Sequence, residues 1–261
     1  MWGAIIGDLA GSIYEFEQYR NISNINVDTL ITRASFFSDD SILTMAILDA
    51  IINNGNYSEY LKLYAKEYMD YVPSFTPYFK RPFSPGFIKW VNGNAIGDST
   101  GNGAMMRISP VGYLFDDEQK IIEEVAKATS PSHNSKEAID CATIVALIIF
   151  NARRGYSKED IINKLGLKFE YIEFQKFNMT CSETLNNCLY ALFYSNDFEE
   201  AIKMVISYGG DTDTNACIVG SMAEALYGID KKLVQQASEK VPQSFVKKLE
   251  KGYSKIKKIN I

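Results

Sequence analysis

The sequence has a single histidine and no pair of cysteines in C-x-x-C spacing. Its cysteines are Cys141, Cys181, Cys188 and Cys217, and only one histidine, His133, could join them as a metal ligand. A structural zinc site needs clustered Cys and His ligands, so the sequence argues against one and predicts reduced thiols. A single histidine also excludes mechanisms that need several, and no G-x-S-x-G motif accompanies it to suggest a serine hydrolase.

Basic charge and long hydrophobic runs are also scarce. The formal net charge is -5 and the pI is about 5.1, which argue against nucleic acid as a partner. The first 17 residues, MWGAIIGDLAGSIYEFE, lack a basic region and reach an acid at Asp8, so they resemble neither a signal peptide nor a membrane span. We therefore expect a cytoplasmic protein without a membrane partner. The lysine-rich tail after Asp230 fits the solvated face of a terminal helix.

Convincing hairpin signals are missing, and the apolar spacing is helical. The Asn-Gly pair in VNGN at 91–94 has no alternating strands beside it. Helical patterns run over 41–55, 135–155 and 214–228, closed by Gly55, Gly155 and Gly228, and further ones over 58–72, 117–130, 182–195, 198–209 and the tail. The sequence therefore predicts an all-α fold, and 261 residues with 46% apolar content fit one large domain without an internal linker.

The segment 73–87 holds four of the seven prolines and predicts a long irregular loop. Long loops inside compact domains commonly carry function. Its aromatic residues fit a pocket wall or a cover over the core equally well.

Acidic and hydroxyl residues gather at the entrances of two predicted helices. The first group is Ser38, Asp39, Asp40 and Ser41, and the second is Asp211, Thr212, Asp213 and Thr214. Such residues cap helices, and the helix dipole favours negative charge there. One cap needs only one of them, whereas like charges held close together need a cation to neutralise them. Each group alone fits a cap or a solvated turn, but the two together favour a metal site.

Oxygen ligands without Cys or His select Mg²⁺, Mn²⁺ or Ca²⁺ over zinc. If the two groups meet, they supply four carboxylates, which is enough for two ions.

A glycine-rich segment, GDSTGNGAMMRISPVG at 97–112, could cradle an anion with its backbone N–H groups. It matches neither the Walker A pattern nor the G-x-G-x-x-G fingerprint, and it could equally be an ordinary turn before a helix. His133 stands before another predicted helix, where it could contact a ligand or simply be a surface or core residue.

The motifs taken in order resemble the ADP-ribosylglycohydrolase family. They are GDLAGSIYE at 7–15, SDDS at 38–41, GNGAMMRISPVG at 101–112, SPSH at 130–133 and GGDTDTNACIVGSMAEALYG at 209–228. The resemblance spans residues 3–228 and implies a single domain over 1–261, in which 229–261 form a C-terminal helical extension. It further implies a compact orthogonal helical bundle with a binuclear Mg²⁺ or Mn²⁺ centre in a cleft.

The resemblance also implies roles for individual residues. The metal set falls on Ser38, Asp39, Asp40, Asp211, Asp213 and Thr214, with Glu15 as a mobile carboxylate that ligates metal or gates the entrance. The ligand-binding set falls on Gly97, Asp98, Ser99, Thr100, Gly101, Asn102, Gly103 and His133. One departure is Ser38, where the family commonly has threonine; serine keeps the ligating hydroxyl but loses a methyl group that restricts its rotamer.

The implied activity is metal-dependent hydrolysis of the glycosidic bond between ADP-ribose and a modified side chain, which releases ADP-ribose. Asp39 or Asp40 would handle protons, and Glu15 would orient water or guard the entrance. The implied partners are ADP-ribose and an ADP-ribosylated protein or other ADP-ribosylated substrate. Two alternatives are an ADP-ribose-binding module without turnover and an all-α, Mg²⁺-dependent nucleotide pyrophosphohydrolase. The presence of the full metal set and Glu15 argues against the first. The second typically places its acids at i, i+3 or i+4 spacing within helices.

Overall fold

The computed structural model describes residues 1–16, 23–73, 81–172 and 179–256, which form helices joined by loops. Across these ranges there is no sheet, only two isolated β-bridges, between Asp98 and His133 and between Gly101 and Thr180. The all-α prediction is confirmed. The helices are α1 (Trp2–Gly11), α2 (Asp39–Asn53), α3 (Tyr57–Glu67), α4 (Pro85–Val91), α5 (Gly103–Met106), α6 (Ser109–Leu114), α7 (Glu118–Thr129), α8 (Lys136–Arg153), α9 (Lys158–Leu165), α10 (Cys181–Tyr194), α11 (Phe198–Ser207), α12 (Thr212–Tyr227), α13 (Lys231–Ser238) and α14 (Gln243–Lys255).

The ends of the predicted helices differ slightly from the observed ones. Helix α12 ends as predicted at Gly228, whose φ is +75°. Helix α2 instead ends at Asn54, which adopts the left-handed conformation with φ 52°. Asparagine tolerates this conformation because its short side chain can hydrogen-bond locally. Gly55, expected to close α2, lies one residue further on.

The predicted irregular segment 73–87 is shorter than expected, because its end begins a helix. Pro85 occupies the first turn of α4, and Ser84 caps that turn by accepting a hydrogen bond from the backbone N–H of Phe87 at 3.3 Å. Proline suits this position because the first N–H groups of a helix have no intrahelical partner. Residues 74–80, which form the middle of the predicted loop, lie outside the described residues.

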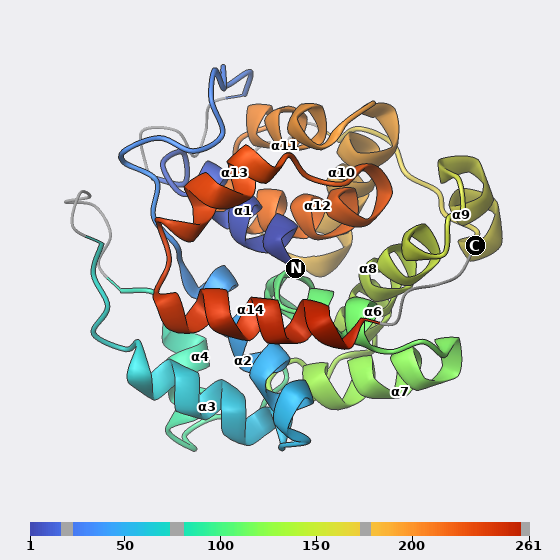
Figure 1. Ribbon diagram of the computed structural model, residues 1–261. Coiled ribbons are helices and arrows are strands. Elements are labelled where there is room, and N and C mark those ends of the chain that lie inside the picture. The colour runs from blue at the N-terminus through green and yellow to red at the C-terminus, as the bar shows by residue number, and fades with distance from the viewer. Residues whose placement is uncertain (17–22, 74–80, 173–178, 257–261) are drawn as a thin grey trace.

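Helix α1 was not predicted, and it packs along α12 at the centre of the molecule (Figure 1). Gly3, Gly7 and Gly11 recur every four residues and therefore share one face of α1. A Cβ atom on any of them would lie 2.0–2.2 Å from a backbone oxygen of α12. The three glycines thus allow the two backbones to approach closely, as small residues do at other helix interfaces.

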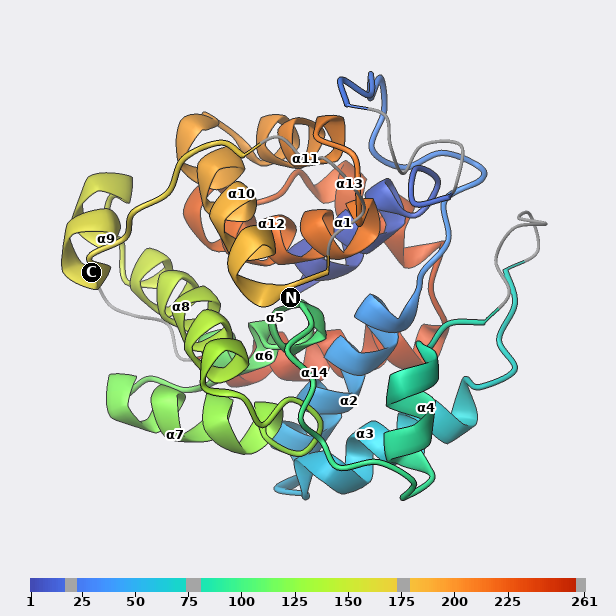
Figure 2. The same cartoon turned by 180° about the vertical axis from the view of Figure 1, so that it is seen from behind.

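The chain after residue 228 packs onto the same core. Helix α14 crosses α2 (Figures 1 and 2). Its residues Phe245 and Leu249 are fully buried. Both belong to one cluster of buried apolar residues that extends from Met1 to Leu249. Within the described ranges, no helix combines the length and the apolar character that a membrane crossing requires.

Candidate metal centre and ligand loop

The two acidic groups of the sequence lie together, at the first turns of α2 and α12. Asp40 joins them: its Oδ2 accepts hydrogen bonds from the hydroxyl of Ser38 at 3.0 Å and from the hydroxyl of Thr214 at 3.2 Å. Ser38 also caps α2, because its Oγ accepts from the backbone N–H of Asp40. Asp211 stands at the N-cap position of α12 but makes no side-chain cap. Helix capping therefore explains why a serine stands at position 38, but it does not explain the aspartate at position 211.

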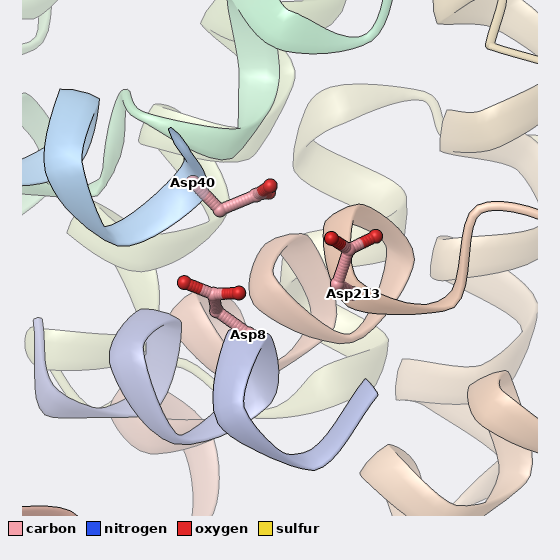
Figure 3. Close-up of side chains that lie close together, drawn as sticks. All are labelled: Asp8, Asp40 and Asp213. Atoms are coloured by element: carbon pink, nitrogen blue, oxygen red, sulfur yellow. The ribbon is translucent and has the colours of Figure 1, made fainter. Parts of the chain in front are cut away.

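Carboxylate oxygens form two groups of three, and Asp213 belongs to both. Asp8, Asp40 and Asp213 each offer an oxygen within 4.8 Å of the other two, and so do Glu15, Asp211 and Asp213. Figure 3 shows that the carboxylates of the first group project from three different helices, α1, α2 and α12, into one common space. Segments some 200 residues apart in sequence thus build one acidic cluster.

Asp8 is the residue that the sequence reasoning missed. Its Oδ2 accepts three hydrogen bonds: from the backbone N–H of Ser38 at 2.9 Å, from that of Ser41 at 3.0 Å and from the Ser41 hydroxyl at 2.5 Å. These bonds fasten the first turn of α2 to α1. The sequence does contain an indication of Asp8. It directly follows Gly7, one of the glycines whose four-residue spacing indicates a closely packed helix.

Asp39 and Glu15 lie beside this cluster in different ways. Asp39 is half-buried and belongs to neither group of three within the described chain. Burial raises the pKa of Asp39 well above its ordinary value, and the charges of Asp213 and Asp8 raise it further. Glu15 is also half-buried, and its hydrogen bond with Asp213 partly opposes the rise that burial causes in the pKa of Asp213.

Burial and mutual repulsion make the cluster costly to ionise. Burial, followed by the charge of Asp213, raises the pKa of Asp8 to about 7 and the pKa values of Asp40 and Asp211 well above normal. Burial also raises the pKa of Asp213, against several hydrogen bonds that lower it. Such a set is unfavourable at neutral pH unless protons or cations neutralise it.

The donor chemistry of the cluster fits a divalent cation. Oδ1 of Asp8 and Oδ1 of Asp40 are buried and have no hydrogen-bond partner within the described residues. Unpaired carboxylate oxygens in the interior are expensive, and a cation would satisfy them. The ligand atoms are carboxylate and hydroxyl oxygens only, which suit hard ions such as Mg²⁺, Mn²⁺ and Ca²⁺.

The glycine-rich segment 97–103 lies against this cluster. Asn102 is buried and donates a hydrogen bond from Nδ2 to Oδ2 of Asp211 at 2.6 Å. Asp98, Ser99 and Thr100 are exposed, and Gly101 and Gly103 are half-buried. The segment thus runs from solvent to the acidic cluster, and it leads into the short helix α5.

His133 lies beside the same segment and is buried. The backbone of its loop pairs with the glycine-rich segment, since Asn134 N–H donates to the Gly97 carbonyl at 2.7 Å and Ser99 N–H donates to the Ser132 carbonyl at 3.2 Å. A Cβ atom on Gly103 would lie 3.2 Å from Nε2 of His133. The glycine therefore keeps the space in front of the ring free of side chains.

Comparison with known proteins identifies the family of this chain. The ADP-ribosylglycohydrolase family matches residues 1–260. The chain is 24% identical to a candidate ADP-ribosyl glycohydrolase of Acanthamoeba polyphaga mimivirus, over 91% of each chain. It is 24% identical to the ADP-ribosylarginine hydrolase Tri1 of Pseudomonas putida (strain GB-1), over 92% of this chain and 77% of that protein.

A solved structure described as an ADP-ribosylglycohydrolase-related protein complex has the same fold, with a TM-score of 0.67 at 18% identity. The match covers 97% of this chain and 93% of that one. The family match spans nearly the whole sequence, and the chain therefore belongs to the ADP-ribosylglycohydrolase family.

Proposed function

We propose that this protein is a metal-dependent hydrolase that cleaves the glycosidic bond between ADP-ribose and a modified side chain and releases ADP-ribose. The observation that carries the proposal is the pair of carboxylate groups that share Asp213, set against a glycine-rich segment by the hydrogen bond from Asn102 to Asp211. Family membership supports the same reaction.

Two divalent cations, Mg²⁺ or Mn²⁺, fit the two groups. Asp8, Asp40 and Asp213 would hold one, and Glu15, Asp211 and Asp213 the other, with the hydroxyls of Ser38 and Thr214 as further oxygen ligands. When bound, such ions polarise substrate hydroxyls and lower the pKa of a coordinated water.

The carboxyls of Asp39 and Asp40 are the proposed proton-transfer groups. Asp40 is fully buried and engaged by two hydroxyls, whereas Asp39 is half-buried and is therefore the more accessible of the two to a substrate. Glu15 is half-buried as well and would orient water or guard the entrance. Positive charge that develops on the ribose in the transition state would be stabilised by the surrounding carboxylates.

The segment from Gly97 to Gly103, with His133 beside it, is the proposed site for the diphosphate part of the ligand. Gly101 and Gly103 have no side chains to block the space in front of His133, and Asp98, Ser99 and Thr100 are open to solvent. The hydrogen bond from Asn102 to Asp211 would couple the position of this segment to that of the proposed metal ligand Asp211.

The linkage can be tested with two matched peptides, one ADP-ribosylated on arginine and one on serine, incubated with Mg²⁺, with Mn²⁺ and with chelator. The arginine hydrolase among the relatives favours the arginine peptide as the substrate. We expect metal-dependent release of free ADP-ribose, identified by mass spectrometry. The Asp211→Ala variant should be inactive, and Asp70→Asn, which changes an exposed acid elsewhere, should behave as the unmodified protein.

The products separate this function from its alternatives. A nucleoside monophosphate would identify a pyrophosphohydrolase instead. Binding of ADP-ribose without release from any ADP-ribosylated peptide, nucleic acid or small molecule would identify a binding module. Full activity of Asp211→Ala would overturn the proposed metal set.

A further inference from the structure

Among the residues that the structure describes, Arg107 is the largest fully buried side chain, with 1% of its surface exposed, and it lies against the loop that carries His133. Its Nη2 donates to the Ser132 hydroxyl at 2.8 Å and lies 3.5 Å from both the Ala128 carbonyl and Nδ1 of His133. Its Nε and Nη1 have no hydrogen-bond partner among the described residues. A charged group so deeply buried is costly, which calls for a specific role.

The direction of the hydrogen bonds around Ser132 follows from the chemistry of Arg107. A guanidinium group has donors only, so the Ser132 oxygen must accept from it. The Ser132 hydroxyl hydrogen is then available for Nδ1 of His133, which lies 2.8 Å from the same oxygen. Nη2 of Arg107 faces that nitrogen as a second donor. A proton on Nδ1 would point at the N–H group of Arg107. Nδ1 is therefore unprotonated and accepts the hydrogen bond from the Ser132 hydroxyl.

The other ring nitrogen of His133 faces the glycine-rich segment. Cβ atoms added to Gly103 and Gly101 would lie 3.2 Å and 4.0 Å from Nε2. A neutral imidazole carries one proton, and with Nδ1 as an acceptor that proton resides on Nε2. The N–H group therefore points toward the two glycines.

We propose that Arg107 and Ser132 are positioning residues that hold His133 as a neutral ring with its proton on Nε2, so that the ring donates a hydrogen bond into the glycine-rich segment. A ligand bound there must offer an acceptor, such as a phosphate or hydroxyl oxygen. The identity of that ligand rests on the proposed function, but the state of the ring does not. Burial and the charge of Arg107 also hold the pKa of His133 well below its ordinary value, which keeps the ring neutral.

The single histidine makes a direct test possible. A long-range ¹H–¹⁵N spectrum of the full-length, ¹⁵N-labelled protein contains the ring signals of His133 alone and distinguishes the two tautomers from the imidazolium. We expect the Nε2–H tautomer from pH 6 to pH 8. An Nδ1–H tautomer or a charged ring at neutral pH would overturn the proposal.

Variants of Ser132 test its role without removing the buried charge. Ser132→Ala should populate both tautomers, and Ser132→Thr, which keeps the hydroxyl, should restore the single one. Thermal unfolding checks that the Ser132→Ala protein is folded. If the folded variant retains only the Nε2–H tautomer, Ser132 does not position the ring.

Addition of ADP-ribose with Mg²⁺ separates this inference from the proposed function. Calorimetry reports binding independently of the ring. Absence of binding would reject the proposed function while the tautomer result stands. Binding that leaves the Nε2–H signal unshifted would reject the role of His133 as a donor to the ligand.

Discussion

Asp8 and Ser41 are joined by two hydrogen bonds to the same carboxylate oxygen, one from the backbone N–H of Ser41 at 3.0 Å and one from its hydroxyl at 2.5 Å. The residues lie 33 positions apart, on α1 and α2. The other oxygen of Asp8, Oδ1, is buried and has no hydrogen-bond partner in the part of the chain that the structure describes. One carboxylate thus both fixes the first turn of α2 and adds negative charge to the acidic cluster.

Replacement of Asp8 by asparagine keeps the volume of the side chain and removes its charge. We expect the affinity for Mn²⁺, measured by calorimetry on the purified protein, to fall by at least about 10–100-fold, because loss of a group that only supports metal ligands already has an effect of that size. Ser41→Ala is the matched control, because it removes one donor to Asp8 and no charge, and its loss should be smaller. Equal affinity of Asp8→Asn and the unmodified protein would contradict this role.

Asp213 is shared by both carboxylate groups, so its loss should affect every bound cation. We expect Asp213→Asn to abolish both Mn²⁺ binding and hydrolysis. The number of Mn²⁺ ions bound per chain, counted by electron paramagnetic resonance titration, checks this. Retention of one tightly bound ion would show that one of the two groups works without Asp213. Asp70→Asn serves as the control for the loss of an exposed aspartate.

The stability of the metal-free protein should fall as the pH rises. Burial raises the pKa of Asp8 to about 7 from an ordinary value of 3.8, and the pKa values of Asp40 and Asp211 rise too. Between these limits the folded protein retains protons that the unfolded chain has released. The free energy of unfolding therefore decreases with pH over about pH 4 to pH 7.

Thermal unfolding in chelator at several pH values measures this decrease. Mg²⁺ or Mn²⁺ should raise the melting temperature more at pH 8 than at pH 5, because the cations bind the ionised carboxylates. Equal stabilisation by the cations at both pH values would argue against binding at these carboxylates.

Gly11 is the glycine of α1 that lies against Thr212 and Asp213. A Cβ atom there would lie 2.2 Å from the Thr212 carbonyl oxygen and 2.5 Å from Cα of Asp213. We expect Gly11→Ala to separate α1 from α12, to lower the free energy of unfolding by about 1–3 kcal/mol or more, and to weaken Mn²⁺ binding. Gly86→Ala is the control, since nothing lies within 4 Å of its added Cβ. Denaturant unfolding and Mn²⁺ titration of both variants check the prediction.

The sequence predicted those parts of the site that depend on local patterns. Asp40 and Asp213 could be placed at helix entrances because capping residues and apolar periodicity are visible in a short window. Asp8 could not, because its role depends on the contact of α1 with both α2 and α12. The motif at 7–15 pointed to Glu15 and not to Asp8, and the four-residue spacing of Gly3, Gly7 and Gly11 did not enter the prediction.

Arg107 shows the same limit at the ligand loop. In the sequence it is one basic residue within GNGAMMR, where a solvent-exposed position would be the ordinary expectation. Its burial and its contact with Ser132 arise from the packing of two segments that lie 25 residues apart. No local periodicity encodes such a contact.

The pairing of α1 with α12 also sets when the site can form during protein synthesis. The hydroxyl of Thr212 donates to the Gly11 carbonyl across 201 positions, and the acidic residues of α12 lie beside it. A ribosome has therefore made most of the chain before the partner of α1 emerges. At about 5–20 residues per second this delay is on the order of 10–40 s. Throughout this interval the glycine face of α1 lacks its partner α12, and a nascent chain that stops short of α12 cannot assemble the acidic cluster.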